Sequence, residues 1–502
     1  MTPVSIKDSR VVNALRIAPA DNVMIALEDL PAGARLGVSG VVTVEPVARG
    51  HKVAIAAIRT GEPVLRYGFP IGRATSTIVP GSHVHVHNVK TGLAGEITYG
   101  AISLDAGPSF TTPASRSFQG YRRPDGRVAT RNEIWILPTV GCVARTAQRI
   151  ADAASMRHAG RLDAIRAFAH PFGCSQLGGD LDATRAVLAT LASHPNAGGV
   201  LIVGLGCESN QLAALVDAIP AASRDRVRTL VSQLSADEIA DGVALVDQLV
   251  DRIAGLERSA CDLGALVLGV KCGGSDSLSG LTANPLVGRM SDAVTAAGGA
   301  AILTEIPEIF GAEHLLMARA ADRDVFDRVG GLVNDFKRYF LDHGEPVSEN
   351  PSPGNIAGGI TTLEEKSLGA VQKAGHATVT DVLRYGEQVR RPGLSLLEAP
   401  GNDAVSSTAL TAAGATLILF TTGRGTPLGF PAPTLKIASN HDLAVRKPGW
   451  IDFDAGGVIE NGQDVVAERL LDRIVAVASG EPTAAERNGE HEIALWKRGV
   501  TL

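Results

Sequence analysis

Four apolar runs of this chain end at a cysteine with a glycine beside it, and this repeated pattern constrains the fold more than any other feature. The fullest copy is Leu266–Gly280, LVLGVKCGGSDSLSG, in which an apolar run typical of a buried strand meets a polar, glycine-rich loop. The other copies end at Cys142, Cys174 and Cys207, whereas Cys261 lies outside the pattern. Loops at the carboxyl ends of parallel strands converge on the ligand site of an open α/β sheet. We therefore expect such a sheet, with its site at that edge.

The rest of the sequence divides into segments of different character. Residues 133 to about 340 alternate strand-like and helix-like patterns, which favours a parallel sheet covered by helices. A loop rich in Gly, Pro and Asn over 343–362 precedes further strands expected at 394–397 and 416–420, while the first hundred residues hold short apolar runs separated by turn residues. We expect a β-rich domain (1–103), a Ser/Thr/Pro-rich linker (104–118), an α/β domain with the Gly-Cys strand ends (119–342) and a C-terminal α/β domain (343–502).

Composition excludes several classes of function. The 502 residues are 45% hydrophobic and 20% charged with a formal net charge of -6, as in an ordinary globular protein. Without a basic block, nucleic acid and anionic membranes are poor partners. No stretch approaches the roughly 20 apolar residues of a membrane helix, and no signal peptide opens the chain, so a cytoplasmic location is expected. Five cysteines argue against a disulfide framework, and nucleotide-binding fingerprints are absent.

The segment Ser82–Asn88, SHVHVHN, concentrates imidazoles in the β-rich domain. Alternation along a strand places His83, His85 and His87 on one face. Such a row can hold a metal or present imidazoles to an anionic substrate, and an exposed edge strand explains it equally well.

Long polar motifs give the chain a resemblance over essentially its whole length. It resembles the altronate and galactarate dehydratase family of sugar-acid hydro-lyases. The motifs that carry the resemblance are ARGHK (48–52), YGFPIG (67–72), HVHVHN, RNEIWILPTVGC, HPFGCSQLG, HPNAGGVLIVGLGCE, CGGSDSLSGLTANP, TEIPEIFGAEHLLM, ENPSPGNIAGGITTLEEKSLG, APGNDAV, FTTGRGTP and KRGVTL.

The resemblance implies a fold and a reaction. The fold is α/β, with a small N-terminal β-clip domain (antifreeze-like, SAF-type) followed by two α/β domains with mostly parallel sheets. The reaction is loss of water from D-altronate to give 2-dehydro-3-deoxy-D-gluconate, with dependence on Fe2+ or a similar divalent metal. Galactarate or another aldonate or aldarate remains an alternative substrate, and a non-catalytic sugar-acid sensor remains an alternative of another class. The oligomeric state, including a homo-oligomer, stays open.

Removing a proton beside a carboxylate requires a base and a means of neutralising the growing charge. We expect His170 as the base, because it is an imidazole at a strand end, with Lys373 and His85 as competitors. Arg424, together with Thr422, is expected to bind the substrate carboxylate, because a guanidinium matches carboxylate geometry. Side chains expected to bind hydroxyls, or only to shape their loops, are Ser275, Asp276, Asn284 and Asn402.

Two sets of side chains are candidates for holding the metal. Cys142, Cys174, Cys207 and Cys272 could bind iron, or an iron–sulfur cluster with one open iron position. The histidine strand, with His83, His85 and His87, supplies the alternative, since a sugar-acid site also suits imidazole and oxygen ligands.

Overall fold

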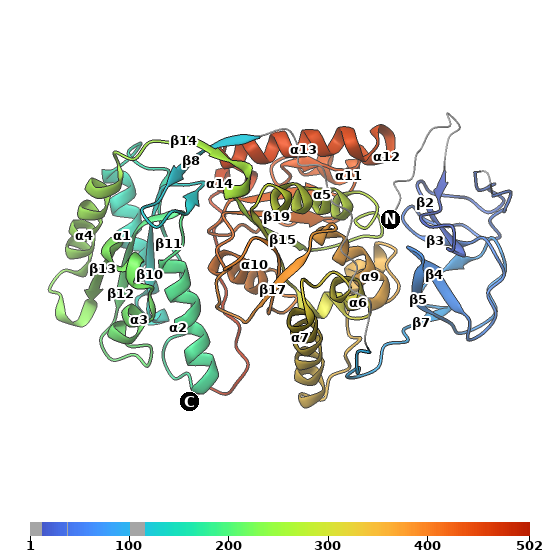
Figure 1. Cartoon of the computed structure of the whole chain (residues 1–502), viewed down its shortest axis with the longest axis horizontal. Coiled ribbons are helices and arrows are strands. Elements are labelled where there is room, and N and C mark those ends of the chain that lie inside the picture. Colours follow the sequence, from blue (N-terminus) through green and yellow to red (C-terminus); the bar gives the residue numbers. More distant parts are fainter. Residues whose placement is uncertain (1–12, 38, 101–115, 502) are drawn as a thin grey trace.

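The computed structural model describes residues 13–37, 39–100 and 116–501. Three units lie in a row along its longest axis (Figure 1). The N-terminal strands stand at one end, a large sheet occupies the centre, and the domain built around β10 and β12 stands at the other end. Within the described residues, no helix is long and apolar enough to cross a membrane.

The N-terminal domain is made of short antiparallel strands joined by tight turns. Buried aliphatic side chains of these strands, such as Met24 and Val53, form a small core of their own. One sheet has the order β1 (Ala14–Leu15), β2 (Val23–Ala26), β3 (Lys52–Ala54), β6 (His83–Val84), and the other has the order β4 (Pro63–Arg66), β5 (Phe69–Ala74), β7 (Val89–Lys90).

The second domain is a parallel sheet with the order β11-β10-β12-β13. Helices α1 and α4 contact one face, and α2 and α3 contact the other, which explains why β10 and β12 are apolar and buried throughout. The elements are β10 (Glu133–Pro138), η1 (Gly141–Val143), α1 (Ala144–Arg157), β11 (Ala164–Ala167), α2 (Gly178–Ala192), β12 (Ala197–Gly204), α3 (Leu212–Ala218), η2 (Ala221–Arg226), β13 (Val227–Val231), η3 (Ser232–Leu234) and α4 (Glu238–Ile253).

A small antiparallel sheet connects this domain to the next one. It has the order β14-β8-β9, and Cys261 of β14 pairs with Phe118 of β8. Its strands are β8 (Ser117–Arg122), β9 (Val128–Ala129) and β14 (Ser259–Asp262).

The C-terminal domain is built on a seven-stranded parallel sheet with the order β17-β18-β16-β15-β19-β20-β21. Helix α5 packs against the central strands and carries α13 outside it, while α10 contacts β15 and β19. The strands are β15 (Val267–Cys272), β16 (Ala300–Leu303), β17 (Val379–Leu383), β18 (Gly393–Leu397), β19 (Leu417–Thr422), β20 (Thr434–Ala438) and β21 (Phe453–Asp454).

The helices of this domain differ widely in length. The longer ones are α5 (Ala283–Ala296), α7 (Arg323–Asp342), α9 (Leu363–Ala370), α10 (Asp403–Ala412) and α13 (Gln463–Ala478). The short ones are η4 (Leu263–Ala265), η5 (Ile306–Ile309), α6 (Glu313–Met317), α8 (Pro353–Ala357), η6 (Val371–Ala374), α11 (His441–Arg446), α12 (Val458–Asn461) and α14 (Ala484–Arg487).

The fold class expected from the sequence is confirmed, but one domain boundary is wrong. The sequence suggested a division between residues 342 and 343. Strands β15 and β16 precede that point, yet they pair with β19 and β18, which follow it. The division between the two α/β sheets therefore lies between α4 and β15. Most of the expected linker, 104–118, lies outside the described residues, and its last two residues already belong to β8.

A buried ion cluster joins the N-terminal domain to the central sheet domain. Lys52 Nζ lies 2.9 Å from the Glu365 carboxylate, and the Arg66 guanidinium donates to the same group. All three side chains are at most 1% exposed. Burial alone would raise the pKa of Glu365, but Lys52 and Arg66 outweigh it and lower the pKa to about 2. Burial also lowers the pKa of Lys52 to about 8. The Glu365 carboxylate offsets this effect only in part, because Arg66 shares it.

Candidate active site

Buried acids and a thiol meet at the carboxyl edge of the seven-stranded sheet. Cys272 ends β15, and Glu305 and Glu308 follow β16, the neighbouring strand. One ligand atom from each of the three side chains lies within 4.8 Å of the others. Glu305 has a φ of 66°, a left-handed conformation that costs a non-glycine residue energy and that folds retain where a side chain must be aimed. Its carboxylate accepts from Cys272 N at 3.0 Å.

Three lysines surround this group. Lys271 Nζ lies 3.0 Å from Glu305, and Lys366 Nζ lies 2.8 Å from Glu308. Lys373 Nζ donates to Cys272 Sγ at 2.9 Å. Buried cations near a binding edge favour an anionic ligand, because they offset negative charge where water is excluded.

The surroundings of the two glutamates push their pKa values in opposite directions. Burial raises the pKa of Glu305, which Lys271 offsets only in part. Burial acts on Glu308 in the same sense, but Lys366 and Lys373 outweigh it, so the pKa of Glu308 lies below its usual value. Burial also raises the pKa of Cys272 to about 12, and the thiol stays protonated at neutral pH. An ionised Glu308 beside protonated neighbours is the arrangement of a proton-transfer site.

Further polar groups follow neighbouring elements around this cluster. Arg424, after β19, is exposed, and its NH1 approaches Gly354 O at 3.4 Å. Lys366 also donates to Asn350 and Asn355, which belong to the segment before α9. Arg424 thus has an exposed side chain, and its binding of a carboxylate stays a prediction.

Among the expected hydroxyl-binding residues, Ser275 alone keeps a free group. Its buried Oγ has no hydrogen-bond partner, and the residue lines a small cavity beside Lys366. The other expected substrate-binding side chains are engaged within the protein. Asp276 accepts from Ser279, Ser439 and Asn440, Asn284 bonds Gly369 and Thr421, Asn402 caps α10, and Thr422 accepts from Gly425 N. For Asp276, Asn284 and Asn402 these contacts fit the structural role that the sequence left open as their alternative, whereas Thr422 was expected to bind the carboxylate together with Arg424.

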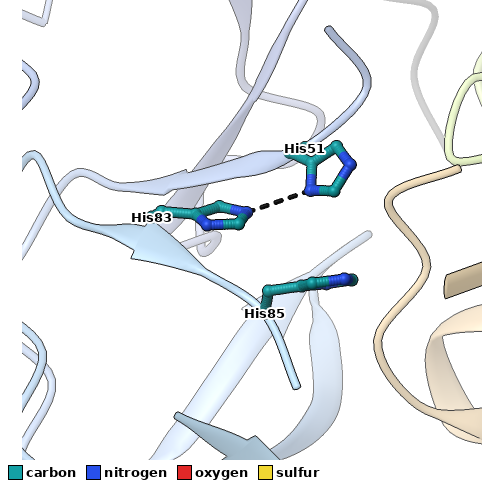
Figure 2. A group of neighbouring side chains, drawn as sticks. All are labelled: His51, His83 and His85. Atoms are coloured by element: carbon teal, nitrogen blue, oxygen red, sulfur yellow. Dashed lines mark hydrogen bonds between the residues drawn. The ribbon is translucent and has the colours of Figure 1, made fainter. Parts of the chain in front are cut away.

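Three histidines of the N-terminal domain come together (Figure 2). His51 Nδ1 lies 3.0 Å from His83 Nε2, and the ring centroids of His51 and His85 are 4.8 Å apart. Their candidate ligand atoms all lie within 4.8 Å of one another. Burial, with Lys52 nearby, lowers the pKa of all three, to about 4 for His83 and His85. We call His51, His83 and His85 the histidine triad.

The triad corrects the expectation drawn from the histidine strand. Strand β6 covers only His83–Val84, and the chain turns at His85, so His87 is exposed and does not join the group. His51 takes its place because β3 pairs antiparallel with β6, with Val53 opposite His83.

The triad suits a divalent metal better than the Cys272 group does. Imidazoles with lowered pKa values are neutral at pH 7 and leave their nitrogens free to bind a cation. Three histidines also leave further coordination positions for substrate or water. Around Cys272, by contrast, the carboxylates already pair with lysines and the thiol is protonated, so a second cation would meet Lys271, Lys366 and Lys373.

The segment from Ser352 to Thr362 connects the two groups. Asn355 of α8 accepts from Lys366, whereas Thr361 Oγ1 lies 3.2 Å from His85 Nδ1. The triad and the cluster around Cys272 therefore both contact one short segment.

The structure argues against His170 as the base. His170 follows β11 in the second domain, not the central sheet, and it is buried. Its Nε2 donates to Pro138 O at 2.8 Å, and its Nδ1 accepts from Phe172 N. Both ring nitrogens thus form hydrogen bonds with backbone groups, and neither is left to accept a proton from a substrate.

The expectation that four thiols act together is also wrong for one of them. Cys142, Cys174 and Cys207 are exposed at the edge of the four-stranded sheet, whereas Cys272 is buried in the seven-stranded sheet. The sequence could not separate them, because each ends an apolar run in the same way. Conversely, the sequence pattern did not single out four residues of these clusters as site residues, although all lie in the polar motifs that carry the resemblance. They are Glu305, Glu308, Lys366 and His51.

The fold and the site are those of an α/β protein with buried acids, lysines and a thiol at the carboxyl edge of a parallel sheet, next to a β-rich domain that carries imidazoles. Three family models match the chain: "Altronate/galactarate dehydratase SAF domain" over 12–92, "D-galactarate dehydratase/Altronate hydrolase, second domain" over 120–254, and "D-galactarate/Altronate dehydratase, C-terminal" over 263–501. The chain belongs to the altronate/galactarate dehydratase family, and it is an enzyme of the hydro-lyase class.

Individual relatives agree with the family models. An altronate dehydratase of Bacillus subtilis (strain 168) is 47% identical, with 97% of this chain and 99% of the relative covered. An altronate dehydratase of Escherichia coli (strain K12) is 48% identical over the same shares. A galactarate dehydratase (L-threo-forming) of Escherichia coli (strain K12) is 32% identical, with 95% of each chain covered.

Proposed function

We propose that the protein dehydrates D-altronate to 2-dehydro-3-deoxy-D-gluconate. The observation that carries the proposal is the buried cluster of Glu308, Lys366, Lys373 and Cys272, with the exposed Arg424 after β19, the strand next to β15. The two relatives at 47–48% identity are named for altronate and the one at 32% for galactarate, which favours the aldonate.

The residues divide the work of the reaction. Arg424 binds the substrate carboxylate, and Glu308, held ionised by Lys366, takes the proton from C2. Lys366 and Lys373 offset the charge that grows on the carboxylate and C2. The C3 hydroxyl leaves as water after protonation, which gives the enol, and the enol takes a proton at C3 to become the 2-keto acid. One substrate thus gives one product and one water.

The histidine triad would hold the divalent metal. A bound ferrous ion supplies Lewis-acid polarisation of substrate oxygens. The triad keeps its imidazoles neutral by burial and places them beside Thr361, whose segment also contacts Lys366 through Asn355.

The activity is tested with D-altronate and galactarate under reducing conditions with Fe2+. We expect D-altronate to be the better substrate, and in heavy water the product should carry deuterium at C3. Glu308→Gln should lower kcat by about 100-fold or more. Glu398→Gln is the matched control, because Glu398 is a buried carboxylate at the end of β18 that bonds Tyr385 and Arg498 instead. Tight binding of either acid without turnover by any metal-loaded sample would refute the proposal.

The metal site is tested by titrating chelator-treated protein with Co2+. We expect saturation near one equivalent and a spectrum without a thiolate-to-cobalt charge-transfer band, because the ligands are imidazoles. His51→Ala should lose this binding, whereas His87→Ala should keep it. A thiolate band, or equal binding by both variants, would contradict the triad as the metal site.

We infer a cytoplasmic location. Five free cysteines fit a compartment that keeps thiols reduced. Cell fractionation with an antibody to the chain tests this, and recovery from an extracytoplasmic fraction would refute it.

A further inference from the structure

Three exposed thiols lie at one edge of the second domain, and the proposed dehydration uses none of them. Cys142 follows β10, Cys174 follows β11 and Cys207 follows β12. These strands are neighbours in the order β11-β10-β12 and run parallel, so all three thiols stand at the same edge. This sheet and the domain that carries the triad occupy opposite ends of the molecule (Figure 1).

The loops that carry the thiols are packed against one another. Gly141 N donates to Phe172 O at 2.9 Å, which joins the Cys142 loop to the Cys174 loop. Asn210 N donates to Gly173 O at 2.9 Å, and Asn210 Nδ2 donates to Thr139 O at 3.2 Å, which ties in the Cys207 loop. A Cβ at Gly173 would lie 2.1 Å from Thr139 O, so this close approach requires glycine.

One residue next to each of two thiols has a positive φ. Ser175, directly after Cys174, has a φ of 54°, which is uncommon for a residue with a side chain. Gly206, directly before Cys207, has a φ of 129°. The Glu208 carboxylate fixes that loop by accepting from Leu205 N, Gly206 N and Thr139 Oγ1. Strain kept by such contacts is typical of sites that must aim a side chain.

The distance between the sulfur atoms distinguishes a site for a single metal ion from a site for an iron–sulfur cluster. Thiolates on one ion, at about 2.3 Å each, bring their sulfur atoms within about 4 Å of one another. Among the residues that the structure describes, the groups of His, Cys, Asp and Glu whose ligand atoms all lie within 4.8 Å of one another are the triad and the Cys272 group, so the three sulfur atoms of the exposed thiols do not all approach that closely. Neighbouring strands are about 4.8 Å apart, so three strand ends spread their loops over about 10 Å. An iron–sulfur cluster uses such spacing, because each cysteine binds a different iron.

We propose that Cys142, Cys174 and Cys207 bind a [4Fe–4S] cluster and leave one iron without a cysteine ligand. The thiols are free and exposed, so a cluster can be assembled on the folded protein. Gln233 Nε2 donates to Cys207 Sγ at 3.5 Å, the kind of hydrogen bond to sulfur that adjusts the potential of a cluster. An iron without a cysteine ligand would be able to take water or a hydroxy acid. This centre is separate from the ion of the triad, and its existence does not depend on the proposed reaction.

The test is anaerobic reconstitution of the full chain with ferrous iron and sulfide. We expect about four irons and about four acid-labile sulfides per chain, with a broad absorbance band near 400 nm. Cys142→Ser, Cys174→Ser and Cys207→Ser should each lose most of the sulfide. Cys261→Ser and Cys272→Ser, at buried cysteines of other sheets, should retain it. Iron at the triad brings no sulfide, so the two centres are counted separately.

Alkylation with iodoacetamide, read by peptide mass spectrometry, tests the same ligands without any substitution. In reconstituted protein the three exposed thiols should be protected, and removal of the cluster by chelation and oxidation followed by re-reduction should expose them. Reconstituted protein that binds iron without labile sulfide would overturn the proposal. So would sulfide retained in all three serine variants, or alkylation of the three thiols at the same rate with and without iron and sulfide.

Discussion

Replacing Glu365 by Gln should loosen the attachment of the N-terminal domain, because it removes the only carboxylate of the Lys52–Glu365–Arg66 cluster. Glutamine keeps the volume and can still accept from Thr361 N, which donates to Glu365 at 2.8 Å. Lys52 and Arg66, at most 1% exposed, would be left as two buried cations. Breaking a buried ion pair from one side costs about 3–5 kcal/mol.

The chain offers a control at the same interface. Arg49 of the N-terminal domain pairs with Asp442 of α11 at 2.5 Å, but the Asp442 side chain is 73% exposed. An exposed pair contributes less than about 1 kcal/mol, so Asp442→Asn should change little. Both variants remove one carboxylate charge, and they differ in its burial.

Native-state hydrogen exchange measures the opening of this interface directly. A cost of about 3–5 kcal/mol raises the open population by roughly 10²- to 10³·⁵-fold, at 1.4 kcal/mol per factor of ten. Peptides that cover β3 and α9 should show this increase in Glu365→Gln, while peptides of β12 should not. Equal exchange in Glu365→Gln and Asp442→Asn would refute the reasoning that burial makes this cluster essential.

Three further outcomes are expected. In the wild type, the interface should weaken as pH falls from about 4.5 towards 2. The fold depresses the pKa of Glu365 to about 2, so the stability that this carboxylate contributes is complete above pH 4.5 and is lost when it is protonated. Hydrogen exchange at β3 should become faster over the same pH range. Gly280→Ala should destabilise the same interface by about 1–3 kcal/mol, since its Cβ would lie 2.1 Å from Tyr67 Oη, as thermal unfolding can check. Lys373→Met should lower kcat by about 100-fold or more. His170→Ala should lower the stability of the second domain but leave kcat within roughly twofold. Steady-state kinetics on folded protein measures this contrast.

Local pattern was enough to predict much of the architecture. The apolar runs before Cys142, Cys207 and Cys272 do form buried strands, since burial on both faces of a parallel sheet demands continuous apolar sequence. The loops after them do carry polar groups at the carboxyl edge. The long polar motifs indicated the family correctly, because side chains in functional loops are specified by chemistry and not by packing alone.

Which strands share a sheet, and which side chains meet, was decided only by the tertiary structure. β15 pairs with β19, about 150 residues later, and no local signal separates that pairing from a sheet of neighbouring strands. His51 joins His83 through β3–β6 pairing, and Glu365 meets Lys52 from more than 300 residues away. The sequence around His170 is compatible with a free imidazole, but in the fold both of its nitrogens form hydrogen bonds with the backbone of Pro138 and Phe172. Residue type and spacing along a strand follow from short-range geometry, but hydrogen-bond partners and burial depend on contacts that form only when distant segments pack together.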